Sequence, residues 1–127
     1  LFQPEDVQAL KIEHPNATVI VHPECSHEMR KVADFIGSTS KMCKYAKEST
    51  AKEFIVGTEN GIIHRLQKEN PGKKFYVSYD GAVCPNMKLT TLDRVYTSLK
   101  EEKTIVEVPA AVSEKARTSL ERMFQVK

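Results

Sequence analysis

Val19-Ile20-Val21-His22-Pro23-Glu24-Cys25 is the stretch that decides the fold. Three β-branched apolar residues in a row are typical of a short strand that is buried on both faces, as in a parallel sheet. The histidine, the carboxylate and the thiol that follow then lie just beyond the carboxyl end of that strand. Open α/β sheets bind their ligands at this edge. The stretch therefore predicts an α/β fold with polar chemistry at one edge of its sheet.

The chain on either side of this stretch alternates between helix and strand signals. Short runs of β-branched and aromatic residues predict strands over 17–21, 35–36, 53–57 and 74–78. Helices are expected to begin at Pro4, after the Gly37–Ser40 segment, and at the capping residues Ser26, Thr58, Thr90 (in a capping box with Asp93) and Ser113. This alternation indicates βαβ units with right-handed crossovers. We predict a single three-layer αβα domain over residues 1–127, with a mostly parallel, Rossmann-like sheet of about four strands and a C-terminal helix.

The composition is that of an ordinary globular protein, with 127 residues, 40% hydrophobic and 28% charged. The net charge is +2 and both signs are interspersed, which gives no case for nucleic acid or a membrane surface as a partner. No apolar run approaches the roughly 18 residues of a membrane-spanning helix, and no signal peptide is recognisable. Because the first residue is Leu rather than Met, we expect the chain to be part of a longer one.

The three cysteines, Cys25, Cys43 and Cys84, stand far apart in the chain. An odd number without a close pair argues against a disulfide framework and indicates reduced thiols in a cytoplasmic protein. Cys84 lies in a predicted loop beside Pro85, where it is either a metal ligand or nucleophile or an inert buried thiol. Cys25 and Cys43 are interpreted as structural.

His22 and Glu24 are the first candidates for chemistry. They are either an acid and a base, or hydrogen-bonding groups that orient a substrate. The alternative is a loop histidine beside a glutamate that accepts hydrogen bonds from the next helix. The sequence alone does not choose between these interpretations, since a histidine changes its charge close to neutral pH.

Gly37-Ser38-Thr39 is the candidate anion site. Glycine allows close approach to the backbone, and hydroxyl and N–H groups at a helix start favour phosphate or carboxylate. The alternative is that Ser38 or Thr39 only caps the helix. The segment is not a Walker loop, because neither GxxxxGK[ST] nor GxGxxG is present.

Several spaced motifs occur together in one order. They are VHPEC at 21–25, AD-x-x-GSTS at 33–40, GTE-x-G at 57–61, C-x-NM-x-x-x-TL at 84–92 and RMF at 122–124. In this combination the chain resembles the C-terminal part, the third domain, of quinolinate synthase. The resemblance implies an enzyme of NAD biosynthesis that condenses iminoaspartate with dihydroxyacetone phosphate to quinolinate. It also implies three similar αβα domains around a cleft with a [4Fe-4S] cluster, held by one cysteine from each domain.

Carried over residue by residue, the resemblance implies that Cys84 is one of the three cluster ligands. It implies that His22 and Glu24 are catalytic residues that contact the substrates, and that Ser38 and Thr39 bind a carboxylate or phosphate. The small-molecule substrates and the remaining domains of the same enzyme are the implied partners.

The departure from the family pattern is that two domains and two cluster cysteines are not in this sequence. We therefore expect the chain alone to be inactive and to hold no stable cluster. A second hypothesis is a stand-alone anion-binding αβα module without catalysis, which uses Gly37-Ser38-Thr39 and a helix start at Thr58.

Overall fold

The computed structural model describes residues 2–103 and 105–125. Contacts divide the chain into two compact units, Leu1–Pro85 and Asn86–Lys127. A single domain over 1–127 stays a prediction. None of the described helices combines the length and the apolar character needed to cross a membrane.

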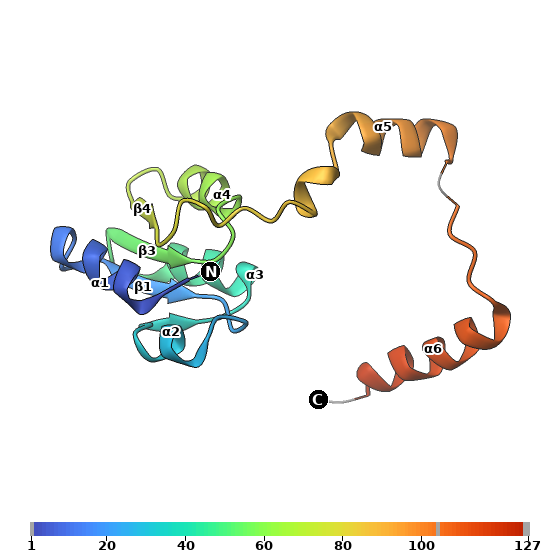
Figure 1. The fold of residues 1–127 in the computed structure, drawn as a ribbon, viewed down its shortest axis with the longest axis horizontal. Helices are drawn as coiled ribbons and strands as arrows, with labels where there is room; N and C mark the ends of the chain where they lie inside the picture. The colour runs from blue at the N-terminus through green and yellow to red at the C-terminus, as the bar shows by residue number, and fades with distance from the viewer. Residues whose placement is uncertain (1, 104, 126–127) are drawn as a thin grey trace. The chain divides into compact units, whose positions relative to one another are not determined.

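The first unit contains a sheet of four parallel strands, β1 (Thr18–Val21), β2 (Phe35–Ile36), β3 (Glu53–Gly57) and β4 (Lys74–Val77). Their order is β2-β1-β3-β4, and every pairing is parallel (Figure 1). All four predicted strands are confirmed to within one residue at either end. Val19, Ile20 and Val21 are fully buried, as expected for a central strand covered on both faces.

Helices cover both faces of the sheet. Helices α1 (Pro4–Glu13) and α2 (His27–Lys31) contribute Val7 and Met29 to a core that also contains the inward residues of one face of β1 and β3. On the other face, α3 (Thr39–Glu48) and α4 (Ile62–Glu69) pack Met42 and Leu66 against Phe54. Since β1 and β3 are buried by both helix layers, the predicted three-layer αβα fold is confirmed.

The caps of α2 and α3 confirm the sequence expectation, whereas the cap of α4 corrects it. Ser26 Oγ accepts from the N–H of Met29 at 3.3 Å, and Ser38 Oγ accepts from the N–H of Lys41 at 3.5 Å. Thr58 does not cap α4, because the helix begins four residues later at Ile62. The intervening backbone is held elsewhere: the N–H of Asn60 donates to the carbonyl of Ala82 at 2.9 Å.

The second unit contains a 3₁₀ turn, Met87–Leu89, followed by α5 (Leu92–Glu101) and α6 (Ala110–Met123). The predicted Thr90–Asp93 capping box is wrong, because Thr91 caps α5 and accepts from the N–H of Arg94 at 3.3 Å. The predicted cap at Ser113 is also wrong, because α6 begins three residues earlier, directly after Pro109. Proline at a helix start needs no N–H partner. Residues 105–108, before α6, form no strand.

Candidate functional site

The strand order creates one topological switch point. The connection that follows β1 leads to β2 on one side of it, and the chain then crosses to β3 on the other side, from which it continues to β4. The carboxyl ends of the neighbouring strands β1 and β3 are therefore followed by connections that run in opposite directions. Such points are where open α/β sheets hold ligands. The residues that follow these ends are His22 and Thr58, and the N–H of His22 donates to the carbonyl of Gly57 at 3.1 Å.

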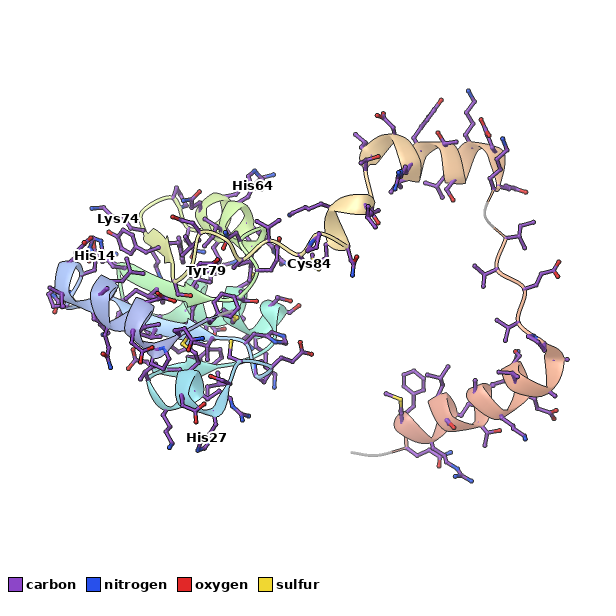
Figure 2. The ribbon with its side chains drawn as sticks, in the orientation of Figure 1. His14, His27, His64, Lys74, Tyr79 and Cys84 are labelled. Carbon is purple, nitrogen blue, oxygen red and sulfur yellow. The ribbon has the colours of Figure 1, made fainter. Side chains whose placement is uncertain are left out.

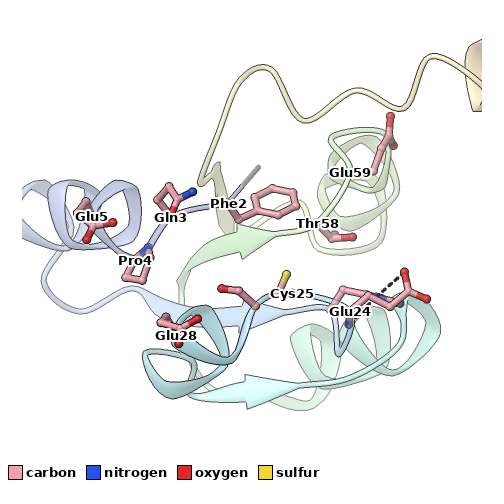
Figure 3. A pocket seen from close by; sticks show the side chains of 11 residues that line it. Phe2, Gln3, Pro4, Glu5, Glu24, Cys25, Glu28, Thr58 and Glu59 are labelled. Carbon is pink, nitrogen blue, oxygen red and sulfur yellow. Dashed lines mark hydrogen bonds and ion pairs between the residues drawn. The ribbon is translucent and has the colours of Figure 1, made fainter.

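A pocket of about 580 Å³ opens at this point (Figure 3). Its lining includes the four-residue turn His22–Cys25, named here the HPEC turn, the start of α1, the start of α2 and the residues after β3. The lining residues are Phe2, Gln3, Pro4, Glu5, His22, Glu24, Cys25, Ser26, Glu28, Thr58 and Glu59. Four of these residues are glutamates and none is lysine or arginine. The pocket therefore presents hydrogen-bonding groups and negative charge.

The HPEC turn fixes the orientation of His22. The turn is closed by the N–H of Cys25, which donates to the carbonyl of His22 at 3.0 Å. The N–H of Glu24 donates to His22 Nδ1 at 3.3 Å, and the Glu24 carboxylate lies 3.9 Å from the same nitrogen. Because Nδ1 accepts a hydrogen bond, the neutral ring carries its proton on Nε2. The Glu24 side chain is 90% exposed, so its carboxylate is accessible to a ligand.

Cys25 connects the HPEC turn to the neighbouring strand. Its thiol donates to the carbonyl of Gly57 at 3.3 Å, and that oxygen also accepts from the N–H of His22. Burial raises the pKa of the Cys25 thiol, so the group stays neutral and is a poor nucleophile near neutral pH. These contacts agree with a structural role.

Ser38 and Thr39 do not line the pocket. Both are exposed at the start of α3, where the Ser38 hydroxyl caps the helix. The structure therefore places His22 and Glu24 in one pocket, whereas the Gly37-Ser38-Thr39 segment is not part of the lining of that pocket. The binding of carboxylate or phosphate by Ser38 and Thr39 stays a prediction.

Cys84 is half-buried on the loop that follows β4, and it does not line the pocket either (Figure 2). The other two thiols have contacts in other places. The Cys25 thiol donates a hydrogen bond to the carbonyl of Gly57, and Cys43 is buried in the core beneath α3. The described residues contain no group of three or more His, Cys, Asp or Glu side chains placed to hold a metal ion. A [4Fe-4S] cluster takes three or four thiolates. The donors of this chain by themselves therefore do not fit such a cluster.

Thr58 and Phe2 are among the pocket residues that sequence reasoning missed. Thr58 was interpreted as a helix cap, but it is 9% exposed and lies in the wall of the pocket. Its position directly after a parallel strand that neighbours β1 is a signal that points to this edge. Phe2 precedes α1, and its half-buried side chain packs against the core on the α1 and α2 side of the sheet. No pattern in the sequence marks that contact.

Comparison with known proteins gives one consistent family. The family model described as "Quinolinate synthetase A protein" matches residues 1–125. Relatives named quinolinate synthase include those of Alkaliphilus metalliredigens, 47% identical over 122 residues, Thermodesulfovibrio yellowstonii, 45% over 124, and Methanosarcina barkeri, 47% over 123. These alignments cover 96–98% of this chain and 40–41% of each relative. The chain spans about 40% of the length of the relatives it matches and belongs to the quinolinate synthase family.

Proposed function

We propose that the pocket at the switch point is part of the active site of a quinolinate synthase. The reaction joins iminoaspartate to dihydroxyacetone phosphate and gives quinolinate, phosphate and water, in the pathway to NAD. The observation that carries the proposal is the HPEC turn, which presents an oriented imidazole and an accessible carboxylate to one cavity. A cytoplasmic location is part of the proposal and agrees with three free thiols.

The side chains in the pocket match the proton movements that this condensation requires. Forming a pyridine ring from the two substrates removes protons from carbon and nitrogen and adds protons to departing oxygens. Glu24 offers a carboxylate that accepts a proton, and His22 offers an Nε2–H that donates one. Since Nδ1 is held by the HPEC turn, the proton of the neutral ring stays on Nε2.

Cys84 is the residue of this chain that would contribute to a [4Fe-4S] cluster. Bound in the active site, the cluster would supply a Lewis acid for the substrate. Two further thiolates would have to come from outside this chain, because Cys25 and Cys43 are held in the fold of the first unit.

The alternative, an anion-binding module without catalysis, loses support from two contacts. The Ser38 hydroxyl is already used as a helix cap, and α4 does not begin at Thr58. The pocket also contains four glutamates and no lysine or arginine, which disfavours a bare anion.

The test uses a quinolinate synthase of the relatives' full length in which this chain forms the matching segment, named here the complete enzyme. We expect it to convert iminoaspartate and dihydroxyacetone phosphate to quinolinate and to hold about four irons per chain after anaerobic reconstitution. Cys84→Ser should lose both the iron and the activity, whereas Cys43→Ser should keep the iron. This chain alone should retain far fewer irons. Failure of the complete enzyme to form quinolinate, or about four irons on this chain alone, would contradict the proposal.

A further inference from the structure

The hydroxyl of Thr58 is a polar group of the pocket to which the proposed reaction assigns no role. We propose that Thr58 is a substrate-binding residue that holds a neutral oxygen, a carbonyl or a hydroxyl, of the triose phosphate. The assignment rests on the proposed function, since the two substrates come from it. With this assignment, Thr58 becomes the third polar side chain of the pocket with a role in the reaction, beside His22 and Glu24, and its ligand is the triose phosphate.

Most of Thr58 is buried, and its hydroxyl has no partner within the described part of the chain. The residue is 9% exposed, and no hydrogen bond joins its side chain to another described residue. The hydroxyl oxygen is not among the fully enclosed polar atoms that lack a partner, so it is accessible from the pocket and free to accept or donate a hydrogen bond there. The side chain borders the pocket, so a ligand in the pocket is the group that can complete its hydrogen bonding.

The sheet register places Thr58 beside His22. Val21 pairs with Gly57 across the parallel β1 and β3 strands, and the N–H of His22 continues this ladder to the carbonyl of Gly57 at 3.1 Å. The next residues along both strands are His22 and Thr58. Both line the same pocket as Glu24, and Figure 3 shows Thr58 and Glu24 together in its wall. A ligand that contacts the imidazole is therefore within reach of the hydroxyl.

The charges of the pocket select the kind of oxygen that Thr58 can bind. Glu24 and Glu59 line the pocket together with Glu5 and Glu28, and no lysine or arginine does. The phosphate and carboxylate groups of the substrates would be repelled by these side chains, so a neutral carbonyl or hydroxyl oxygen is the substrate group that lies most favourably beside them. Iminoaspartate has only carboxylate oxygens. The neutral oxygens, one ketone and one hydroxyl, belong to dihydroxyacetone phosphate, so Thr58 is assigned to the triose.

A role in helix capping or packing does not explain these observations. The helix after β3 begins at Ile62 behind Gly61, with the Glu59 carboxylate accepting from the N–H of Gly61 at 2.7 Å. A role in packing alone would depend on the methyl group of Thr58 rather than on its hydroxyl. Serine and valine substitutions separate these two parts of the side chain.

Steady-state kinetics of the complete enzyme test the assignment with the variants Thr58→Val and Thr58→Ser. The control is Thr18→Val, because Thr18 is a half-buried strand residue outside the pocket. Thr58→Val should raise the KM for dihydroxyacetone phosphate about tenfold, since one hydrogen bond is lost. The KM for iminoaspartate should stay within about twofold. Thr58→Ser, which keeps a hydroxyl, should raise the KM for dihydroxyacetone phosphate less than Thr58→Val does. Thr18→Val should resemble the wild type in both constants. The melting temperature of Thr58→Val should stay close to that of the wild type, because the hydroxyl has no hydrogen bond to the described chain to lose.

Two results would overturn the assignment. In an active wild-type enzyme, an unchanged triose KM for Thr58→Val, or a larger effect of Thr58→Ser than of Thr58→Val, would show that the hydroxyl does not bind the triose. A wild-type enzyme that forms no quinolinate would instead overturn the proposed function itself. The wild-type rate therefore distinguishes the two failures.

Discussion

The carbonyl oxygen of Gly57 accepts two hydrogen bonds that fix the HPEC turn. One comes from the N–H of His22 at 3.1 Å and the other from the Cys25 thiol at 3.3 Å. A further bond, from the N–H of Glu24 to His22 Nδ1, sets the tautomer of the ring. Cys25 therefore holds in position the two residues to which the chemistry is assigned, and it does so as a neutral donor.

Cys25 should react slowly with alkylating reagents in the folded chain. Burial raises its thiol pKa above the ordinary value of 9.0, and the thiolate is the reactive form. Alkylation by iodoacetamide at pH 7.5, followed by mass spectrometry, should be slower than in the chain unfolded by urea. The rate should still rise as the pH passes 9, because the folded thiol loses its proton above that value. Equal rates in the folded and unfolded chains would contradict this account.

At the scale of elements, the strands and the caps of α2 and α3 could be predicted from local patterns. A β-branched run favours a strand, and a serine caps a helix, through interactions with residues only a few positions away in the chain. The starts of α4 and α5 could not be predicted in this way. Before α4 the backbone is held by tertiary hydrogen bonds, such as that from the N–H of Asn60 to the carbonyl of Ala82. Before α5 the neighbouring residues Thr90 and Thr91 are equally good caps. Of the residues that line the pocket, only those of the HPEC turn could be placed at the site from the sequence. Thr58 joins it through the register of β1 with β3, which is a long-range property.

Gly57 is required where β3 passes under α2 beside β1. A Cβ at this position would lie 2.9 Å from Val21 Cγ1 and 3.2 Å from Met29 Cε, both of them side chains in the buried core. Gly57→Ala should lower the free energy of unfolding by about 1–3 kcal/mol, measured by urea titration.

Gly72→Ala is the matched control, because a Cβ there meets nothing within 4 Å and the glycine does not have a positive φ. It should be neutral or stabilise the chain by up to about 1 kcal/mol. Equal effects of the two substitutions would show that close packing does not explain Gly57.

At the scale of the whole molecule, the two units differ in how they are stabilised. The first has buried residues on both faces of its sheet, whereas α5 and α6 of the second contain none among the described residues. The first unit therefore has its own core and carries the pocket. The family relation extends over both units, since the match covers residues 1–125. Sequence motifs could predict this relation because they extend over both units. Those at 21–61 lie in the first, the one at 84–92 begins in the first and ends in the second, and RMF at 122–124 lies in the second.

The central claim is that the HPEC turn carries catalytic chemistry for quinolinate formation, and the turnover number of Glu24→Gln in the complete enzyme tests it most directly. The amide keeps the size of the side chain but does not act as a base. We predict a fall in kcat of about 10²-fold or more, with an unchanged iron content. Glu48→Gln, which changes an exposed side chain at the end of α3 outside the pocket, should keep the wild-type kcat. A Glu24→Gln enzyme that turns over at the wild-type rate would contradict the account.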